Sequence, residues 1–465
     1  MMRKRKNWRI ISGAALFLVS YIGYGQQTTY DLAIKNVKVF DSKTKKTLEK
    51  KTILINSDTI ASIVSSSQKV KATKTIDGNN RLIVPGFIDT HTHLRNVYGT
   101  IEDVEKDSMR LDRKKLADTY LNYGTTTVVD MGMPEVWMNT LLDWQKKPAP
   151  EYPNIYISGG AMVSEEQGRK TYMNHVVVKS PEDARLKVTE YADKGLEHIK
   201  IYWRLRQPEM EAVISEGKEQ NLTISAHIDN NITSISDAID LGVKNFEHML
   251  ALPPAVFNLY NQRALMRPKY GLGEIESNDQ FLAQILFFFD YIKENPEWNS
   301  KLEALFDKMA KNDATLSTAI HIMGSVAGKT YFFTSLTLNA DTISLGGYTL
   351  AQKERLGKCF DVMMSYLKRA HDKGVRIRIG TDCTNGGKAL LSELLLLYEA
   401  NFKIEDILQI ATLNGAKAMN IDGKYGSIEK GKKADLIIFD KNPFYNYKNL
   451  LSKKVIIKGG KIYGN

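Results

Sequence analysis

The sequence predicts a (β/α)8 barrel with a small β-sandwich domain formed by both ends of the chain. Between residues 85 and 420, eight short apolar segments alternate with amphipathic stretches, which is typical of a parallel sheet covered by helices. Near both chain ends, short β-type runs are separated by polar turns instead. Eight successive strand–helix units favour a closed barrel. A doubly wound open sheet is the alternative, but no Gly-rich phosphate loop follows the first apolar segment to support it.

The barrel strands are expected at residues 81–93, 124–132, 154–161, 198–203, 222–228, 244–249, 314–320 and 376–382. Residues 26–84 and 421–465 are expected to pair into one β-sandwich domain, because neither segment alone has enough apolar surface to be stable. The barrel then covers residues 85–420, with inserts near 251–312 and 322–349 after the sixth and seventh strands. Inserts at these places lie on the C-terminal face of a barrel, where active sites are built, so both are expected to cap the site.

The first insert reads as two helices that are interrupted near Pro296. It contains three consecutive phenylalanines, Phe287 to Phe289. Such a run favours ordinary helix core over a substrate-binding patch.

Residues 1–25 have the three parts of a secretory signal peptide. Five Lys and Arg residues and no acid come first, a short apolar stretch follows, and Gly23-Tyr24-Gly25 supplies small residues for cleavage. The apolar stretch is shorter than the roughly 20 residues that a membrane-spanning helix needs. We therefore expect cleavage before Gln26, export to the periplasm or the medium, and no stable membrane span afterwards. An uncleaved N-terminal anchor is the alternative.

The composition is that of an ordinary soluble protein, with 43% hydrophobic and 25% charged residues among 465. The net charge of +11 falls to +6 once the five positive residues before Gln26 are removed. So small a surplus, spread over a long chain, argues against nucleic-acid binding. Cys359 and Cys383 are too few for a disulfide framework, although a single bridge would be feasible.

Polar side chains close five of the eight expected strands. His91 and His93 end the first strand and point to the same face, because alternate residues of a strand share a face. Four further strands, the fourth, fifth, sixth and eighth, end in Lys200, His227, His248 and Asp382. These ends converge at one mouth of a barrel. Several histidines with an aspartate form a typical metal-binding set, whereas the alternative for His91 and His93 alone is a polar loop.

The motifs PGFIDTHTH, HIKIY, SAHI, NFEHM and GTD, in this order, resemble those of the amidohydrolase superfamily. The C-terminal GAKAMNIDGKYGSIEKGKKADLIIFDKNP is similar to that family's return to its β-sandwich. Within the superfamily, the chain is most similar to the prolidase-like and imidazolonepropionase-like branch.

The resemblance implies two divalent metal ions, with zinc as the default for a His-rich site. One ion would be held by His91, His93 and Asp382, and the other by His227 and His248. Lys200 would bridge both ions after reaction with CO2 to a carbamate, because an ammonium has no lone pair for a metal. The alternative is an unmodified Lys200 beside a mononuclear site.

Substrate contacts are expected from residues that follow the strands. Tyr202 shares the face of Lys200, and Arg204 or Arg206 could hold a substrate carboxylate, although a solvated loop fits them equally. The other candidates are His175, which lacks the Gly-Gly that precedes it in this branch, and His321 after the seventh strand. His198 lies deeper in the fourth strand and is expected to be a core histidine.

The predicted activity is hydrolysis of an amide bond in a small substrate such as a dipeptide or an N-acyl amino acid. A metal-bridging hydroxide would attack the carbonyl, with Asp382 as general acid and base. The alternatives are a mononuclear hydrolase or deaminase acting on a cyclic C–N bond, and an inactive barrel that only binds. Whether the chain forms a homo-oligomer is left open.

Overall fold

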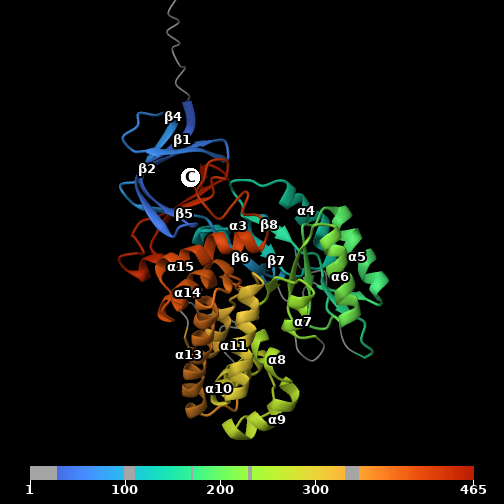
Figure 1. Ribbon diagram of the computed structural model, residues 1–465. Helices are drawn as coiled ribbons and strands as arrows, with labels where there is room; N and C mark the ends of the chain where they lie inside the picture. Colours follow the sequence, from blue (N-terminus) through green and yellow to red (C-terminus); the bar gives the residue numbers. More distant parts are fainter. Residues whose placement is uncertain (1–28, 99–109, 169–170, 229–232, 330–344, 465) are drawn as a thin grey trace, which may run out of the picture.

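The computed structural model describes residues 29–98, 110–168, 171–228, 233–329 and 345–464. The expected signal peptide, residues 1–25, and the central part of the second expected insert, residues 330–344, lie outside these ranges. Within the described ranges, no helix is both long and apolar enough to cross a membrane. A β-rich sheet lies at one end of the molecule and a group of long helices at the other, with the barrel between them (Figure 1).

The β-rich sheet is built from both ends of the chain, as predicted. Its strands run in the order β18-β17-β16-β5-β1-β2-β3, with β4 beside β1. The antiparallel pair β16 and β5 joins the two ends, and isoleucines such as Ile34, Ile53, Ile83 and Ile438 form a core of their own. The strands are β1 (Thr29–Asp41), β2 (Lys46–Asn56), β3 (Thr59–Ser65), β4 (Lys71–Asp77), β5 (Leu82–Pro85), β16 (Leu436–Phe439), β17 (Lys454–Lys458) and β18 (Lys461–Ile462).

Every one of the eight expected barrel strands is present, and all their pairings are parallel. They are β6 (Phe87–Thr92), β7 (Thr125–Asp130), β8 (Asn154–Ile157), β11 (His198–Ile201), β12 (Thr223–Ala226), β13 (Asn245–Phe246), β14 (Thr315–Ser317) and β15 (Arg376–Arg378). One arc is β6-β7-β8, and the other runs from β11 to β15, with β9 (Ala161–Ser164) and β10 (His175–Val178) beside β11. The last strand meets the first, because Thr90 N donates to Ile379 O at 3.0 Å and Asp382 N donates to His91 O at 2.8 Å. The predicted barrel is confirmed.

Helices that follow the strands cover the barrel. They are α1 (Arg95–Tyr98), α3 (Arg113–Tyr120), α4 (Met138–Lys146), α5 (Pro181–Lys194), α6 (Gln207–Glu219), α7 (Ile235–Asp240), α14 (Gly386–Glu399), α15 (Ile404–Gln409) and α16 (Gly415–Ala418). The sequence sets their ends in recognisable ways. The Ser180 hydroxyl, for example, accepts from Asp183 N before α5, and Gly195 ends that helix at a φ of 89°.

A cap of helices fills the region between β13 and β15. It consists of α8 (Leu252–Val256), α9 (Leu259–Tyr270), α10 (Asn278–Glu294), α11 (Pro296–Lys311), α12 (Ile320–Val326) and α13 (Leu350–Asp372). The break near Pro296 occurs because the Asn295 side chain caps α11 by accepting from Glu297 N and Trp298 N. Phe287, Phe288 and Phe289 are fully buried in α10 as helix core. The cap projects away from the β-rich sheet (Figure 1).

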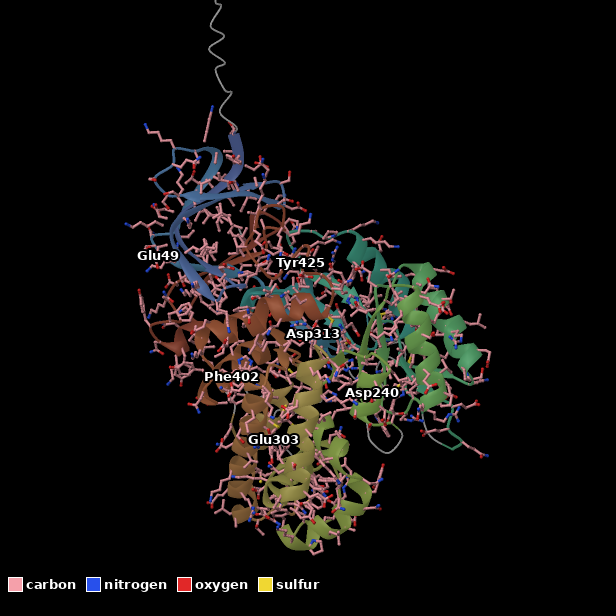
Figure 2. All side chains as sticks on the ribbon, viewed as in Figure 1. Glu49, Asp240, Glu303, Asp313, Phe402 and Tyr425 are labelled. Atoms are coloured by element: carbon pink, nitrogen blue, oxygen red, sulfur yellow. The ribbon has the colours of Figure 1, made fainter. Side chains whose placement is uncertain are left out.

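Residues of the β-rich sheet, such as Phe40, Val84 and Ile437, belong to the same hydrophobic core as the barrel, and a small apolar cluster lies next to the segment that leads back to the sheet. Tyr425, in the segment that leads back to the sheet, packs in one cluster with Ile88, Val129 and Tyr156 of the barrel strands. Figure 2 shows Tyr425 between the β-rich sheet and the barrel, and Glu303 within the cap, on helix α11. Cys359 and Cys383 are both buried free thiols.

Candidate metal and active site

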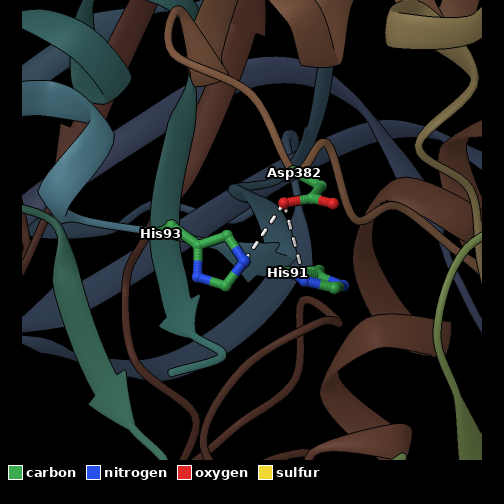
Figure 3. Close-up of side chains that lie close together, drawn as sticks. All are labelled: His91, His93 and Asp382. Carbon is green, nitrogen blue, oxygen red and sulfur yellow. Dashed lines mark ion pairs between the residues drawn. The ribbon is translucent and has the colours of Figure 1, made fainter. Parts of the chain in front are cut away.

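His91, His93 and Asp382 converge at the C-terminal ends of β6 and β15. The Nε2 atoms of His91 and His93 lie 3.7 Å and 3.2 Å from Asp382 Oδ1. One potential ligand atom from each of the three residues lies within 4.8 Å of the other two. Figure 3 shows both imidazoles turned toward the same carboxylate. This geometry suits a single divalent cation among three ligands.

The distal ring nitrogens of both histidines have hydrogen-bond acceptors. His91 Nδ1 lies 2.8 Å from Glu247 Oε2, and His93 Nδ1 lies 3.3 Å from Gly132 O. Each acceptor favours the tautomer with the proton on Nδ1, which leaves the Nε2 lone pair directed at the site. Burial, together with the charge of Lys200, lowers the pKa of His91 and keeps its imidazole neutral. A neutral imidazole is the form that binds metals.

Glu247 is the centre of a buried polar network that sequence reasoning missed. Its carboxylate accepts from Arg378 at 2.8 Å and from the Ser317 hydroxyl at 2.8 Å, besides its contact with His91. Burial opposes ionisation, but the charges of Arg378 and Lys200 outweigh it and hold the pKa of Glu247 well below its usual range. The signal in the sequence was an acidic residue at the end of a short apolar strand, directly before His248.

Two residues of the site have strained backbones. His248 has a φ of 42° and Asp382 a φ of 49°, a region that costs a non-glycine residue roughly 1–3 kcal/mol. Hydrogen bonds hold both: His248 N donates to the Ser317 hydroxyl at 2.8 Å, and Asp382 N donates to His91 O at 2.8 Å. Such strain at strand ends is typical of functional sites.

Asp382 is ionised in this setting. Burial by itself would raise the pKa of this carboxyl group, but the adjacent imidazoles of His91 and His93 outweigh it and lower the pKa. The carboxylate is therefore available as a ligand and as a proton acceptor.

Lys200 is buried close to the histidines of the site, where burial and the Lys200 charge together lower the pKa values of His91, His227 and His248. Its side chain is about 2% exposed, and Nζ lies 4.0 Å from Glu247 Oε1. No hydrogen-bond partner for Nζ occurs in the described part of the chain. Burial lowers the pKa of Lys200 to about 8, against the opposing attraction of Glu247 and Asp382. A buried amine with an unsatisfied donor is costly unless it acquires a further partner.

His227 and His248 form a second pair beside the first group. Their ring centroids are 4.3 Å apart, and the His248 ring lies 5.5 Å from that of His91. Burial lowers the pKa of His248 to about 3, and burial together with the charge of Lys200 lowers the pKa of His227 well below its ordinary value. Both are therefore neutral potential ligands. Among the described residues, His91, His93 and Asp382 form the group whose ligand atoms all lie within 4.8 Å of one another, and His227 and His248 do not belong to it.

The donor set fits the divalent metal ions that the family resemblance implies. Neutral imidazoles and an ionised carboxylate are the ligand types that bind zinc and related ions. The unsatisfied Nζ of Lys200 adds an independent reason for a group to be held at the same place.

Among the candidate substrate contacts, Tyr202 and His175 lie next to the site. The Tyr202 ring is 5.1 Å from that of His227 and 5.0 Å from that of His175. His321 begins the first turn of α12 and is fully buried, and neither ring nitrogen has a hydrogen-bond partner among the described residues. Burial lowers the pKa of His321 to about 4.

The two candidate arginines pair with carboxylates of the chain itself. Arg204 lies 3.1 Å from Glu166, and Arg206 pairs with Glu209 one turn along the chain. Both are thus engaged in internal ion pairs. His198, which was expected in the core, is buried with Nε2 2.9 Å from Met419 O.

The sequence and fold both match known proteins. The profile of the Amidohydrolase family matches residues 82–255 and 334–462, more than half of the chain. This chain belongs to the amidohydrolase family. It is a hydrolase that acts on C–N bonds.

Three similar proteins illustrate the range of this family. A 5-methylthioadenosine/S-adenosylhomocysteine deaminase of Thermoanaerobacter pseudethanolicus is 23% identical, covering 91% of this chain and 88% of the relative. An imidazolonepropionase of Bdellovibrio bacteriovorus is 30% identical over 25% of this chain and 30% of its own length. The crystal structure of a prolidase complexed with N-methylphosphonate-L-proline superposes with a TM-score of 0.65, at 18% identity, over 93% of this chain and 98% of the prolidase.

Proposed function

We propose that this amidohydrolase cleaves an amide bond of a small substrate such as a dipeptide or an N-acyl amino acid. The observation that carries the proposal is the convergence of His91, His93 and Asp382 within 4.8 Å, beside a buried Lys200 that has no hydrogen-bond partner among the described residues. The likeness of the fold to a prolidase supports the choice of a peptide-like amide.

Two groups of side chains would hold the metal ions. His91, His93 and Asp382 would bind one ion, and His227 with His248 would bind the other. Lys200 would lie between them as a carbamate formed with CO2, which would turn a buried cation into an anion with two ligand oxygens. Bound divalent ions, with zinc as the default, would lower the pKa of a coordinated water and polarise the substrate carbonyl.

The residues of the chain have distinct tasks in this scheme. Glu247 and Gly132 O fix the tautomers of His91 and His93, so that both Nε2 atoms face Asp382. Asp382, which is ionised, would accept the proton of the attacking water at a carboxylate oxygen and pass it to the leaving nitrogen. Tyr202, whose ring lies beside that of His227, and His175, whose ring lies beside that of Tyr202, would contact the substrate.

A second function has support of its own. The closely spaced group contains only three ligands, as a mononuclear site would. One relative that aligns over most of the chain is a deaminase, and some shorter matches are imidazolonepropionases. The alternative is therefore a mononuclear hydrolase or deaminase that acts on a cyclic C–N bond.

The two functions are separated by a substrate panel. The purified chain, supplied with zinc, would be given dipeptides, N-acyl amino acids, imidazolonepropionate and adenosine derivatives. The proposal expects a free amine and a carboxylate from the linear amides, and loss of this activity in Asp382→Asn. Turnover confined to the cyclic substrates would instead establish the alternative.

We also propose that the protein is exported, because residues 1–25 have the pattern of a signal peptide. An exported hydrolase of small amides would act on peptides or acylated amino acids outside the cytoplasm.

A further inference from the structure

A cavity of about 310 Å³ lies between the barrel mouth and the cap. Tyr202 and Trp203, which follow β11, and His227, which follows β12, form one of its walls. The remaining walls come from α8, α9 and α10 and from the segment before them. His227 therefore faces both the cavity and the candidate metal site, so a group that fills the cavity would lie directly beside the reacting bond.

Most of the residues that the cap contributes to the cavity walls are apolar. Phe281 and Ile285 lie one turn apart on α10 and so share a face of that helix, and Leu250 and Pro254 line the cavity from the segment before α9. Trp203 adds an aromatic surface beside Tyr202. Small-molecule pockets have volumes of roughly 300–1,000 Å³. A cavity at the lower limit of this range has room for one bulky side chain and its adjoining backbone, but not for a polypeptide.

Arg263 contributes a guanidinium to this largely apolar cavity. It lies one turn after Leu259 on α9, and both residues line the cavity. Among the described residues of the lining, Arg263 is the only Lys or Arg. A guanidinium at an apolar pocket suits a carboxylate, which it can bind through two parallel hydrogen bonds. The Arg263 guanidinium lies over the Tyr260 ring, 5.7 Å from the ring centroid, and Tyr260 also lines the cavity.

We propose that the substrate is an amide of an amino acid with a bulky apolar, preferably aromatic, side chain and a free carboxylate. The side chain would occupy the cavity against Phe281 and Ile285, and Arg263 would bind the carboxylate. This inference rests on the proposed amide hydrolysis. It implies that residues of the cap select the substrate.

The test is kcat/KM for a series of N-acetyl amino acids, from glycine through alanine and leucine to phenylalanine. Removal of a phenylalanine side chain from water is expected to raise kcat/KM about 10- to 100-fold over the glycine compound. The methyl ester of N-acetylphenylalanine should be a poorer substrate than the free acid. Equal kcat/KM values across the series would overturn the inference while leaving the proposed function intact.

Three variants locate the selectivity in the cavity. Ile285→Trp should fill the space and lower the ratio of the phenylalanine to the glycine kcat/KM about tenfold or more. Phe281→Ala should enlarge the space and shift the preference toward tryptophan. Leu265→Trp is the matched control, because Leu265 is 62% exposed on α9 and does not line the cavity. If Ile285→Trp and Leu265→Trp change the ratio of the phenylalanine to the glycine kcat/KM equally, the cavity does not bind the side chain of the substrate.

Arg263→Gln should raise KM for N-acetylphenylalanine. In this variant, the kcat/KM values of the free acid and of its methyl ester should be similar. Binding of 3-phenylpropionate to the full-length mature chain separates this inference from the proposed function, because that probe has no amide bond. The cavity predicts that 3-phenylpropionate binds at least about tenfold more tightly than propionate, and that Ile285→Trp removes the difference. If this preference is found but no amide is hydrolysed, the proposed function fails and the cavity assignment stands. If both carboxylates bind alike, the cavity assignment fails.

Discussion

Glu247 Oε2 lies 2.8 Å from His91 Nδ1, and both side chains are sealed from solvent. The contact fixes which nitrogen of His91 is turned toward Asp382. The same carboxylate also accepts from Arg378 at 2.8 Å, so it neutralises a guanidinium at the centre of the barrel. One residue therefore orients a candidate metal ligand and compensates a buried charge, and substitutions can separate these two tasks.

Glu247→Gln is expected to weaken metal binding about 10- to 100-fold, because the acceptor that orients His91 becomes neutral. It should also lower the free energy of unfolding by about 3–5 kcal/mol, because Arg378 loses its carboxylate partner inside the protein. Metal affinity would be measured by competition with a chelator, and stability by denaturant unfolding.

The double variant Glu247→Gln/Arg378→Met is the control for this prediction. Removal of the buried cation should restore part of the lost stability but not the metal affinity. Recovery of both would show that Glu247 affects metal binding only through stability, and would contradict its orienting role.

Lys200→Ala is expected to reduce both metal affinity and amide hydrolysis by more than about tenfold, because a lost ligand should cost at least as much as a lost partner of a ligand. Short-chain carboxylic acids should restore part of the activity by taking the place of the carbamate. Lys194→Ala, at an exposed lysine near the end of α5, is the matched control. An equal response of the two variants to added carboxylic acid would exclude the bridging role.

Glu393 should make stability depend on pH. This buried carboxyl group of α14 accepts from His321 N at 3.0 Å and from the Thr318 hydroxyl, and burial raises its pKa to about 8. Its pKa in the unfolded chain is about 4.3. The folded state therefore binds the proton more tightly, and its stability should decrease as the pH rises from about 4 through about 8.

Glu393→Gln has no carboxyl proton to lose, so its stability should not show this decrease as the pH rises. Its thermal midpoint relative to the parent should rise by roughly 2–4 °C between pH 5.5 and 8.5. Glu297→Gln, on the exposed surface of α11, is the control: the difference between its thermal midpoint and that of the parent should not change with pH. A midpoint difference for Glu393→Gln that does not change with pH would mean that Glu393 is ionised throughout this range.

Export is expected to remove the first 25 residues. N-terminal sequencing of protein recovered outside the cytoplasm should begin near Gln26, because the small residues Gly23 and Gly25 precede that bond. An intact Met1 in the membrane fraction would establish an anchor instead.

Much of the fold could be predicted from the sequence because strand and turn patterns are local. The eight apolar segments and the two β-rich ends have such patterns, and the polar residues at the strand ends follow from barrel geometry. The break before Pro296 was visible for the same reason. The cavity between barrel and cap could not be predicted, since it depends on how α9 and α10 pack against the loops after β11 and β12.

The residues of the site that end strands could be predicted from the sequence. Residues whose role depends on an ion pair with a distant partner could not. His91, His93 and Asp382 come together as expected. Arg204 and Arg206 looked suitable for a carboxylate, but their partners Glu166 and Glu209 could only be found in three dimensions. Glu247 was overlooked because its only sign in the sequence is a single glutamate between a short apolar strand and His248, a pattern with no characteristic spacing. Its role depends on Arg378, 131 residues away in the sequence.

The central claim is a pair of metal ions bridged by a carboxylated Lys200. Native mass spectrometry of active, full-length mature protein tests it most directly, because one spectrum reports the bound metal ions and the added mass of CO2. The account predicts two divalent ions per chain and one CO2, which is absent from Lys200→Ala. A single ion and an unmodified lysine in fully active protein would contradict it.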